Sequence, residues 1–221
     1  RSALQQHADR IFGAGTCEIR PTPLAAEWSA SFAVFHKRSD DPLISLIIPT
    51  KDGLELLEPC VRSILEISTH TNLEIVIVNN NSTQAETLAY FHRIQNGGLP
   101  RCRVVDAPFP FNWSRVNNVG AVVAQGDVLV FMNNDMEVIT PDWLEWLSGY
   151  ALQPAIGVVG AQPLREDSTL QHAGIVLGLG GWCDHIFDHQ KPDLTDTEFV
   201  PPALIRNVSA VTGACMAISA E

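Results

Sequence analysis

The sequence is poor in the features that mark several common classes of protein. It has 14 Lys and Arg against 25 Asp and Glu, and the net charge of −11 argues against a nucleic-acid-binding surface, because such a surface needs clustered basic side chains to neutralise phosphates. No apolar run approaches the length that spans a bilayer. The five cysteines contain no Cys-x-x-Cys pair, so neither a disulfide scaffold nor a zinc site is indicated, and reduced thiols in a cytoplasmic protein are expected.

The common nucleotide-binding fingerprints are also missing. No Gly-x-Gly-x-x-Gly follows the first apolar run, and the P-loop pattern Gly-x-x-x-x-Gly-Lys-Ser/Thr occurs nowhere. A dinucleotide-dependent oxidoreductase and a P-loop ATPase are therefore disfavoured. If the chain binds a nucleotide, side chains and a metal ion must hold it in place of a glycine-rich loop.

What is present points to a compact protein with one main domain. The 221 residues are 46% apolar and 18% charged, which suits one large domain, or one domain with an appendage. We expect residues 1–42 to be an N-terminal appendage or linker, with a short helix from Ala3 to Phe12 and a Pro-punctuated, strand-forming region. Because the sequence begins at Arg1 and stops at Glu221 after a strand-like run, we interpret it as a piece of a longer protein.

Beyond residue 42, predicted strands alternate with predicted helices. Near-continuous apolar runs, typical of strands buried on both faces of a parallel sheet, occur at 43–48, 73–78 and 127–132, and shorter strands are expected at 103–106 and 156–160. Residues with helical spacing lie between them. Short connections with right-handed crossovers then predict an α/β fold with a doubly wound, mostly parallel sheet and helices on both faces. Residues 161–206 are rich in Gly, Pro and His and predict loops and hairpins.

Local signals refine the predicted helices. Thr83-Gln84-Ala85-Glu86 matches a capping box, in which the Thr hydroxyl and the Glu carboxylate accept end N–H groups. Asn112 is expected to cap the helix that carries Val116 and Gly120 on its inner stripe. Pro59 is expected in a first helical turn, where its missing N–H is tolerated.

Polar residues follow the predicted strands where ligands bind in open α/β sheets, at the carboxyl ends. These segments are Pro49 to Gly53, Asn79 to Ser82 and Asn133 to Asp135. Asp135 is the candidate metal ligand, because Mg²⁺ or Mn²⁺ takes one or two carboxylates and completes its shell with water and phosphate oxygens. The alternative is an ordinary turn carboxylate, since Asn and Asp are common in turns.

The order and spacing of these segments resemble the family 2 glycosyltransferases, which have the GT-A fold. The matching segments are Ile44 to Thr50, Glu74 to Thr83, Asn117 to Gly120, Ala124 to Asp135 and Val211 to Met216. The similarity implies a GT-A domain over residues 43–221 that lacks its C-terminal part. It looks nearest to bacterial members that build surface polysaccharides, including rhamnosyltransferase-like ones.

The resemblance implies metal-assisted, inverting transfer of a sugar from a UDP- or dTDP-sugar to a hydroxyl of a glycan or lipid-linked acceptor. It assigns the metal, Mg²⁺ or Mn²⁺, to Asp135, and nucleotide-sugar contacts to Thr50, Asn79, Asn80, Asn133 and Asn134. Amides stand where the family usually has a base-binding Asp and the first Asp of its Asp-x-Asp motif. An amide keeps an acceptor and adds donors. A single remaining carboxylate implies weak metal binding in the absence of nucleotide.

The general base is unknown. In the family it usually lies beyond the Thr-Gly-Ala-Cys strand, and the sequence stops at Glu221; Asp184 and Asp188 are the only tempting substitutes. The amides and the missing base motivate an alternative, a non-catalytic nucleotide-sugar-binding or scaffolding domain of a larger protein. Peripheral membrane association through the rest of the parent chain stays open, as do the sugar, the linkage and the oligomeric state.

Three further sets of side chains have two readings each. His172, His185 and His189 could form a metal cluster, but a helix there is disfavoured by the surrounding Gly and Pro, and loop or acceptor-side roles are favoured. Trp182 could stack on a sugar ring or pack at the fold edge. Arg115 could touch phosphate or be a solvated surface residue.

Overall fold

The computed structural model describes residues 2–22, 24, 31–193 and 201–221. Its contacts define two compact units, each assembled from separate parts of the chain. We call residues 40–159 with 213–221 the sheet unit, and residues 1–39 with 160–212 the hairpin unit. The predicted division into residues 1–42 and 43–221 stays a prediction, because compactness alone does not show which part folds independently.

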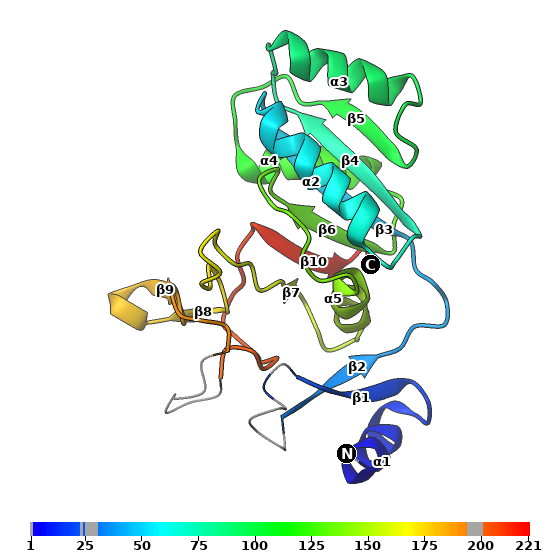
Figure 1. Ribbon diagram of the computed structural model, residues 1–221, viewed down its shortest axis with the longest axis vertical. Coiled ribbons are helices and arrows are strands. Elements are labelled where there is room, and N and C mark those ends of the chain that lie inside the picture. Colours follow the sequence, from blue (N-terminus) through cyan, green and yellow to red (C-terminus); the bar gives the residue numbers. More distant parts are fainter. Residues whose placement is uncertain (1, 23, 25–30, 194–200) are drawn as a thin grey trace. The chain divides into compact units, whose positions relative to one another are not determined.

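The sheet unit is built on a mostly parallel sheet of six strands in the order β5-β4-β3-β6-β10-β7 (Figure 1). β3 pairs in parallel with both β4 and β6, β4 pairs in parallel with β5, and β10 runs antiparallel to β6. The strands are β3 (Ile44–Thr50), β4 (Leu73–Asn79), β5 (Cys102–Asp106), β6 (Val128–Met132), β7 (Val159–Gly160) and β10 (Cys215–Ser219). The predicted mostly parallel α/β sheet is confirmed.

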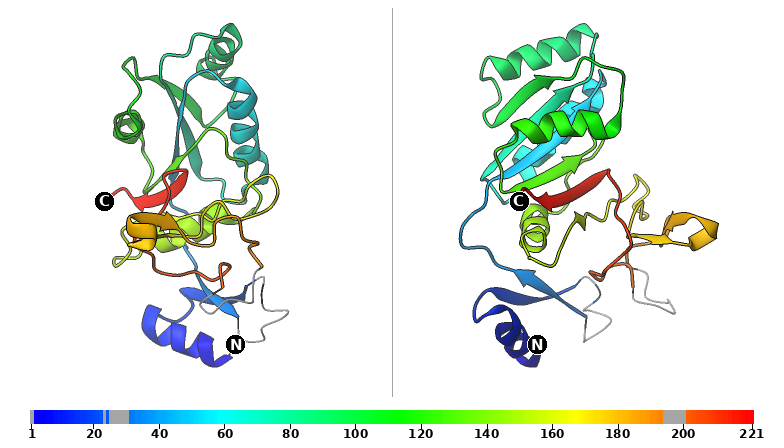
Figure 2. Two further views of the ribbon diagram at one scale, coloured as in Figure 1. Left: turned by 90° about the vertical axis from the view of Figure 1, so that its left-hand side faces the viewer. Right: turned by 180° about the vertical axis from the view of Figure 1, so that it is seen from behind.

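Helices cover both faces of this sheet. They are α2 (Leu54–Ile67), α3 (Ala85–Gln95), α4 (Trp113–Val123) and α5 (Trp143–Ala151). Figure 2 shows α2 and α3 on one face and α4 on the other, while α5 packs against β10. The doubly wound arrangement follows from the sequence, since strands with apolar side chains on both faces need a helical layer on each side.

The packing of α4 onto the sheet depends on a glycine. A Cβ on Gly120 would lie 2.4 Å from Cγ2 of Ile47 and 3.0 Å from Cγ2 of Val78, so only glycine permits this approach of helix to sheet. Val116 of the same helix is fully buried in a cluster with the β3 and β4 side chains. The predicted cap is confirmed, because the Asn112 side chain accepts the Arg115 N–H at 2.9 Å.

Three local predictions are wrong. α2 runs through Pro59 beyond its first turn; the carbonyl of Glu55, which loses its intrahelical donor, belongs to an exposed residue and can bond water. α3 begins at Ala85 with no side-chain cap from Gln84, and the predicted capping box does not form. The strand expected at 156–160 is only Val159–Gly160, because residues 156–158 are irregular, with a bend at Gly157.

The hairpin unit contains short elements, as predicted for its second segment. Its elements are α1 (Ser2–Phe12), β1 (Cys17–Pro21), β2 (Phe32–His36), β8 (Ile175–Leu177), the 3₁₀ turn η2 (Leu179–Gly181) and β9 (Cys183–His185). β1 pairs antiparallel with β2, and β8 pairs antiparallel with β9. Within the described ranges, none of the helices is both long and apolar enough to cross a membrane.

A partly buried polar network fixes the amino ends of the central strands. The Ser45 hydroxyl donates to Oε1 of Glu74 at 2.6 Å and accepts the N–H of Gly126 at 2.8 Å. The same Glu74 oxygen accepts the N–H of Gln125 at 2.7 Å, and its other oxygen pairs with Arg103 at 2.9 Å. Because these bonds join β3, β4 and the turn before β6, they set how the three strands start relative to one another.

Gly126→Ala is expected to destabilise the fold by about 1–3 kcal/mol, the range for overpacking. The new Cβ would lie 2.6 Å from the backbone nitrogen of Ser45 and 2.8 Å from the carbonyl oxygen of Leu43, and backbone atoms cannot move aside. Urea unfolding measures the loss. Gly157→Ala is the matched control, since nothing lies within 4 Å of its Cβ position; equal stability of the two variants would contradict this view of the turn.

Candidate functional site

The carboxyl ends of three neighbouring strands form a row of polar residues. The parallel register sets Thr50 at the end of β3 opposite Asn79 at the end of β4, and Asn79 opposite Asp106 at the end of β5. The N–H of Asn80 donates to the Thr50 carbonyl at 2.8 Å. We call Asp106, Asn79 and Thr50 the strand-end row. Two of its three members were predicted from the sequence as ligand contacts.

The turn after β6 is tied to this row by a side-chain hydrogen bond. Asn134 donates from Nδ2 to the Thr50 hydroxyl at 2.9 Å, and that hydroxyl donates to the Asp52 carbonyl at 3.0 Å. Thr50 is only 4% exposed, so its hydroxyl is fixed by these two bonds. The structure therefore brings together Thr50 and Asn134, which the sequence separates by 84 residues.

Asp135 follows Asn134 and is exposed. In the described part of the chain its carboxylate makes no hydrogen bond or ion pair. Burial raises the pKa of the Cys60 thiol to about 12, and the negative charge of Asp135 adds to that rise. Asn133 is held by its backbone, which donates to the Ala214 carbonyl at 2.9 Å and accepts from the Cys60 thiol at 3.8 Å.

These residues fit a hard divalent cation only together with a ligand that supplies further oxygens. Since Nδ2 of Asn134 is turned to Thr50, the side-chain oxygens that this turn can offer a cation are the Asp135 carboxylate and the amide oxygens of Asn133 and Asn134. No group of three or more His, Cys, Asp or Glu side chains among the described residues could hold a metal. Mg²⁺ and Mn²⁺ are commonly bound by one or two protein carboxylates, with phosphate oxygens and water filling the remaining positions.

Asn79 and Asn80 have different surroundings. Asn80 is 3% exposed, and its Nδ2 donates to the carbonyls of Ala107 at 2.7 Å and Phe109 at 2.8 Å. Both of its donors therefore hold the loop between β5 and α4, and its predicted nucleotide contact would have to come from its oxygen. Asn79 is only half-buried, and it bonds Asp106 of the strand-end row at 2.8 Å.

Asp52 is a positioning residue that the sequence analysis missed. Its Oδ1 accepts the N–H groups of Thr83 at 2.7 Å and Gln84 at 2.8 Å, and its own N–H donates to the Ser82 hydroxyl at 2.8 Å. It therefore takes the place of the predicted capping box. Asp52 and Gly53 both have positive φ, 57° and 66°, the left-handed conformation that Asp and Gly tolerate best. The sequence did contain a signal for this turn, because an Asp followed by a Gly comes shortly after the apolar run of β3.

The other candidates have local explanations. The Arg115 guanidinium lies 3.9 Å from the centroid of the Phe109 ring, so it is engaged in a cation–π contact. A Cβ on Gly213 would lie 2.6 Å from Cζ2 of Trp113, which explains a glycine in the Thr-Gly-Ala-Cys segment. Trp182 is 87% exposed, so it is not packed at the fold edge, and stacking on a sugar stays a prediction.

The histidines of the hairpin unit form a contact rather than a metal cluster within the described residues. His172 is 1% exposed, and its Nδ1 lies 3.1 Å from Nδ1 of His185. Burial, with a smaller effect of His185, lowers the pKa of His172 to about 4, so its ring is neutral at pH 7. The Arg165 side chain bonds Asp188 at 2.7 Å and holds the pKa of that carboxyl below its usual value, which makes Asp188 a poor general base.

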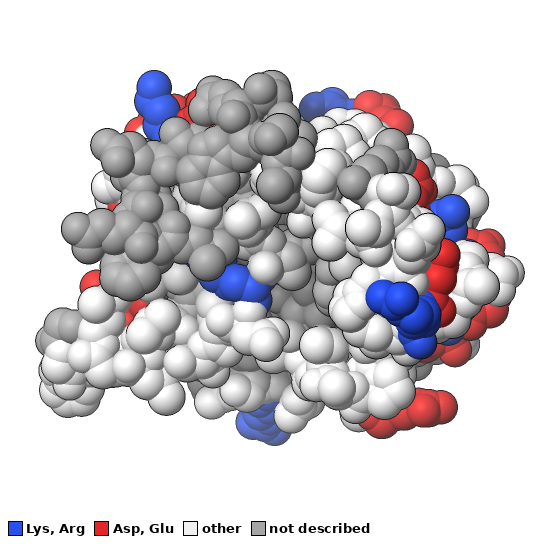
Figure 3. Space-filling model, turned by 90° about the horizontal axis from the view of Figure 1, so that it is seen from below, with Lys and Arg blue, Asp and Glu red and all other residues white. Residues whose placement is uncertain are grey.

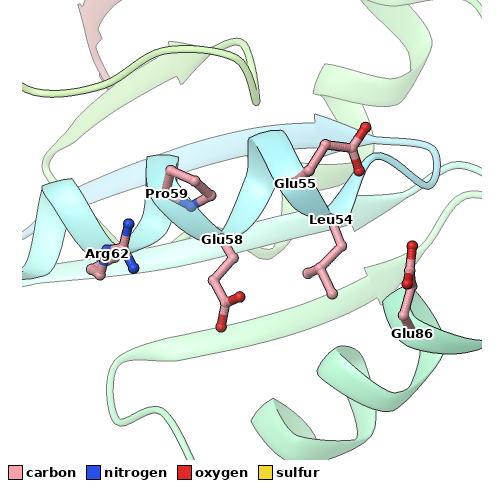
Figure 4. Close-up of a pocket in the computed structure, with 6 residues that line it drawn as sticks. All are labelled: Leu54, Glu55, Glu58, Pro59, Arg62 and Glu86. Carbon is pink, nitrogen blue, oxygen red and sulfur yellow. The ribbon is translucent and has the colours of Figure 1, made fainter.

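A surface hollow of about 290 Å³ contains none of the residues of the strand-end row in its lining. Figure 4 shows its lining on the N-terminal half of α2 and the first turn of α3: Leu54, Glu55, Glu58, Pro59, Arg62 and Glu86. Three carboxylates and one guanidinium make this hollow unsuitable for an anionic nucleotide. None of its residues was predicted as a site residue.

Basic side chains do not gather on the face shown in Figure 3. The described Lys and Arg residues stand apart there among uncharged and acidic ones. This distribution gives no support to a phosphate-binding patch on that face. The predicted lack of nucleic-acid binding stays a prediction.

The doubly wound sheet and the helices on both faces define an α/β protein of the GT-A class, as predicted. The fold is similar to that of a solved mannosyltransferase, PcManGT from Pyrobaculum calidifontis, in complex with GDP-Man and Mn²⁺. The TM-score is 0.51 at 19% identity, over 74% of this chain and 43% of that one. At this identity the similarity shows the fold alone.

The chain belongs to glycosyl transferase family 2, whose model matches residues 45–178. It is 37% identical to the uncharacterized protein y4gI of Sinorhizobium fredii, over 100% of this chain and 24% of that protein. It is also 37% identical to the O-antigen biosynthesis protein RfbC of Myxococcus xanthus, over 99% of this chain and 16% of that protein. The chain thus spans a quarter or less of the length of these curated relatives.

Acid is expected to weaken the contribution of Asp52 to folding. The N–H groups of Gln84 and then Thr83 hold the pKa of Asp52 below its ordinary value of 3.8. A depressed folded-state pKa stabilises the fold above the unfolded-state pKa, and the gain disappears as the pH falls through the folded-state pKa. The stability advantage of wild type over Asp52→Asn should therefore be full at pH 7 and shrink below about pH 4.

Urea unfolding at several pH values checks this expectation. Glu86→Gln is the control, since it removes an exposed carboxylate of the same charge from the first turn of α3. A wild-type advantage over Asp52→Asn that does not change between pH 7 and about pH 3 would contradict the assigned role.

Proposed function

We propose that this domain binds a nucleotide-diphosphate sugar and a divalent cation, Mg²⁺ or Mn²⁺, at the strand-end row and the turn after β6, and transfers the sugar to a hydroxyl of a glycan acceptor. The observation that supports this proposal best is the Asn134–Thr50 hydrogen bond, which ties the residue next to Asp135 in sequence to the strand-end row. Membership in family 2 supports transfer as the reaction class. The similarity to RfbC supports a surface polysaccharide or its lipid-linked precursor as the acceptor.

Charged and neutral residues have different proposed roles at this site. Asp135 would hold the cation, which on binding supplies positive charge to the departing diphosphate. Thr50, Asn133 and Asn134 contribute neutral contacts, so the phosphates meet one protein carboxylate rather than two. Asn79 would face the nucleoside. The proposed donor is a UDP- or dTDP-sugar. The proposed location is the cytoplasm, where the domain would meet nucleotide sugars.

Asp135→Asn is expected to remove the metal dependence of nucleotide binding. Calorimetry with UDP, dTDP and GDP, with Mn²⁺ and with a chelator, should show about tenfold tighter wild-type binding in Mn²⁺, equivalent to about 1.4 kcal/mol. The variant should bind equally in both conditions. Glu137→Gln, an exposed carboxylate two residues on, should keep the metal dependence. An unchanged response to Mn²⁺ in Asp135→Asn would remove Asp135 from the site.

A second candidate function is a non-catalytic nucleotide-sugar-binding or scaffolding domain. Two observations favour it. Asp135 is the single carboxylate of the Asn133-Asn134-Asp135 turn, and Asp188, one of the two substitutes for a general base, is held in an ion pair with Arg165. Such a domain would bind the donor, while another part of the parent protein carries the chemistry.

Turnover separates the two candidates. The protein that contains this chain should release nucleoside diphosphate from its preferred donor when an acceptor glycan is added. Asp135→Asn should lower the rate of this release by at least about tenfold, because a metal ion typically lowers the barrier of such a step by several kcal/mol. Thin-layer or coupled assays of released nucleotide measure it. Donor binding without transfer or donor hydrolysis, for every acceptor tested, would favour the scaffolding function.

A further inference from the structure

Asp106 is a member of the strand-end row that has no assigned role. It is the last residue of β5 and lies opposite Asn79 in the parallel register. Its Oδ1 accepts the Asn79 Nδ2 hydrogen at 2.8 Å. The residue is exposed, and in the described part of the chain no other side chain or N–H group bonds its carboxylate. The second oxygen of Asp106 is therefore available to a ligand at the edge of the sheet.

The hydrogen bonds around Asn79 fix which way its amide points. Its Oδ1 accepts the N–H of Ser82 at 2.9 Å, while its Nδ2 faces Asp106. A flipped amide would set oxygen against the carboxylate and N–H against N–H, and both contacts are repulsive. Asn79 therefore presents its second N–H hydrogen beside the free oxygen of Asp106. The pair offers one fixed donor next to one charged acceptor.

Position and charge decide which part of the proposed donor can meet this pair. Asp106 lies three strands from β6 in the order β5-β4-β3-β6, about 14 Å at the usual strand spacing of about 4.8 Å. It therefore cannot share a cation with Asp135, because metal–oxygen distances are only about 2.0–2.6 Å. An uncompensated carboxylate also repels phosphates. The diphosphate thus belongs at the Asp135 end, and a neutral, N–H-bearing group belongs at the Asp106 end.

We propose that Asp106 reads the nucleobase: its carboxylate accepts a hydrogen bond from a ring N–H, and the free N–H of Asn79 donates to the neighbouring carbonyl. A ring N–H beside a carbonyl is the edge of uracil, thymine and guanine, which matches a UDP- or dTDP-sugar. This inference rests on the proposed function. It adds a specificity residue on β5, a strand from which the sequence analysis took no site residue.

The test uses Asp106→Asn. The new amide oxygen still accepts from Asn79, so the fold should be kept, but its free side offers N–H in place of a charged acceptor. Calorimetry in Mn²⁺ should show about tenfold weaker binding of the preferred nucleoside diphosphate, because a charge-assisted bond is lost. Binding of Mn²⁺-pyrophosphate, which has no base, should not change. Glu86→Gln, which removes the same charge from an exposed site on α3, should bind both ligands like wild type.

An N3-methylated UDP provides an independent arm of the experiment. It keeps the phosphates and the carbonyls but lacks the ring N–H, so wild type should bind it about tenfold more weakly than UDP, and Asp106→Asn should barely distinguish the two. Equal binding of nucleotide by wild type and Asp106→Asn would overturn the inference and leave the proposed function intact. An equally large loss of pyrophosphate binding in Asp106→Asn would also overturn the inference. So would tighter binding of ADP or CDP than of UDP, dTDP or GDP by wild type. If wild type binds no nucleoside diphosphate, the proposed function itself fails and the inference falls with it.

Discussion

The candidate site depends on one constraint, the parallel register that β3 keeps with β4 and β6 at the same time. Side chains on both faces of β3 are buried, so a shift of one residue would move every apolar side chain to the opposite face. The same shift would separate Thr50 from Asn79. Core packing and site geometry are therefore set by one arrangement, and the network around Glu74 fixes it from the far end of the strands.

Along the carboxyl edge, charged side chains lie at the two ends and neutral side chains lie between them. Exposed carboxylates stand at the two outer positions, Asp106 and Asp135, and neutral hydrogen-bonding groups lie between them on Asn79, Thr50 and Asn134. Neutral amides in the middle do not repel an approaching anion, whereas carboxylates there would repel it unless a cation neutralised them. The site consequently attracts a cation more weakly, because one carboxylate holds a divalent ion less tightly than two.

The fold could be predicted because its signals are long and local. Apolar runs such as 44–48 and 73–78 indicate strands buried on both sides, and the structure places them in the centre of the sheet. Thr50 and Asn134 were named as site residues because each follows such a run, and the hydrogen bond between them shows that adjacent strand ends do meet. Their roles toward a nucleotide stay predictions.

The predicted capping box is wrong, and the packing of Asn80 was not foreseen, because in both cases the hydrogen-bond partner is remote in sequence. The acceptor for the N–H groups before α3 is Asp52, 31 residues before Thr83, so a local capping pattern could not reveal it. Asn80 sits in a polar turn typical of ligand contacts, yet the carbonyls that occupy it belong to a loop 27 and 29 residues later. Asp106 had no sequence signal beyond its place at the end of a strand.

The assembly of the sheet from separate parts of the chain has a consequence for biosynthesis. β10, from Cys215 to Ser219, supplies the second neighbour of β6, although 82 residues separate Met132 from Cys215, its partner in the antiparallel register. Until that last segment leaves the ribosome, β6 has an unsatisfied side with open N–H and carbonyl groups, the kind of surface on which unfinished chains associate. The nascent protein thus exposes this open strand edge while the second segment of the hairpin unit, residues 160–212, is being synthesised.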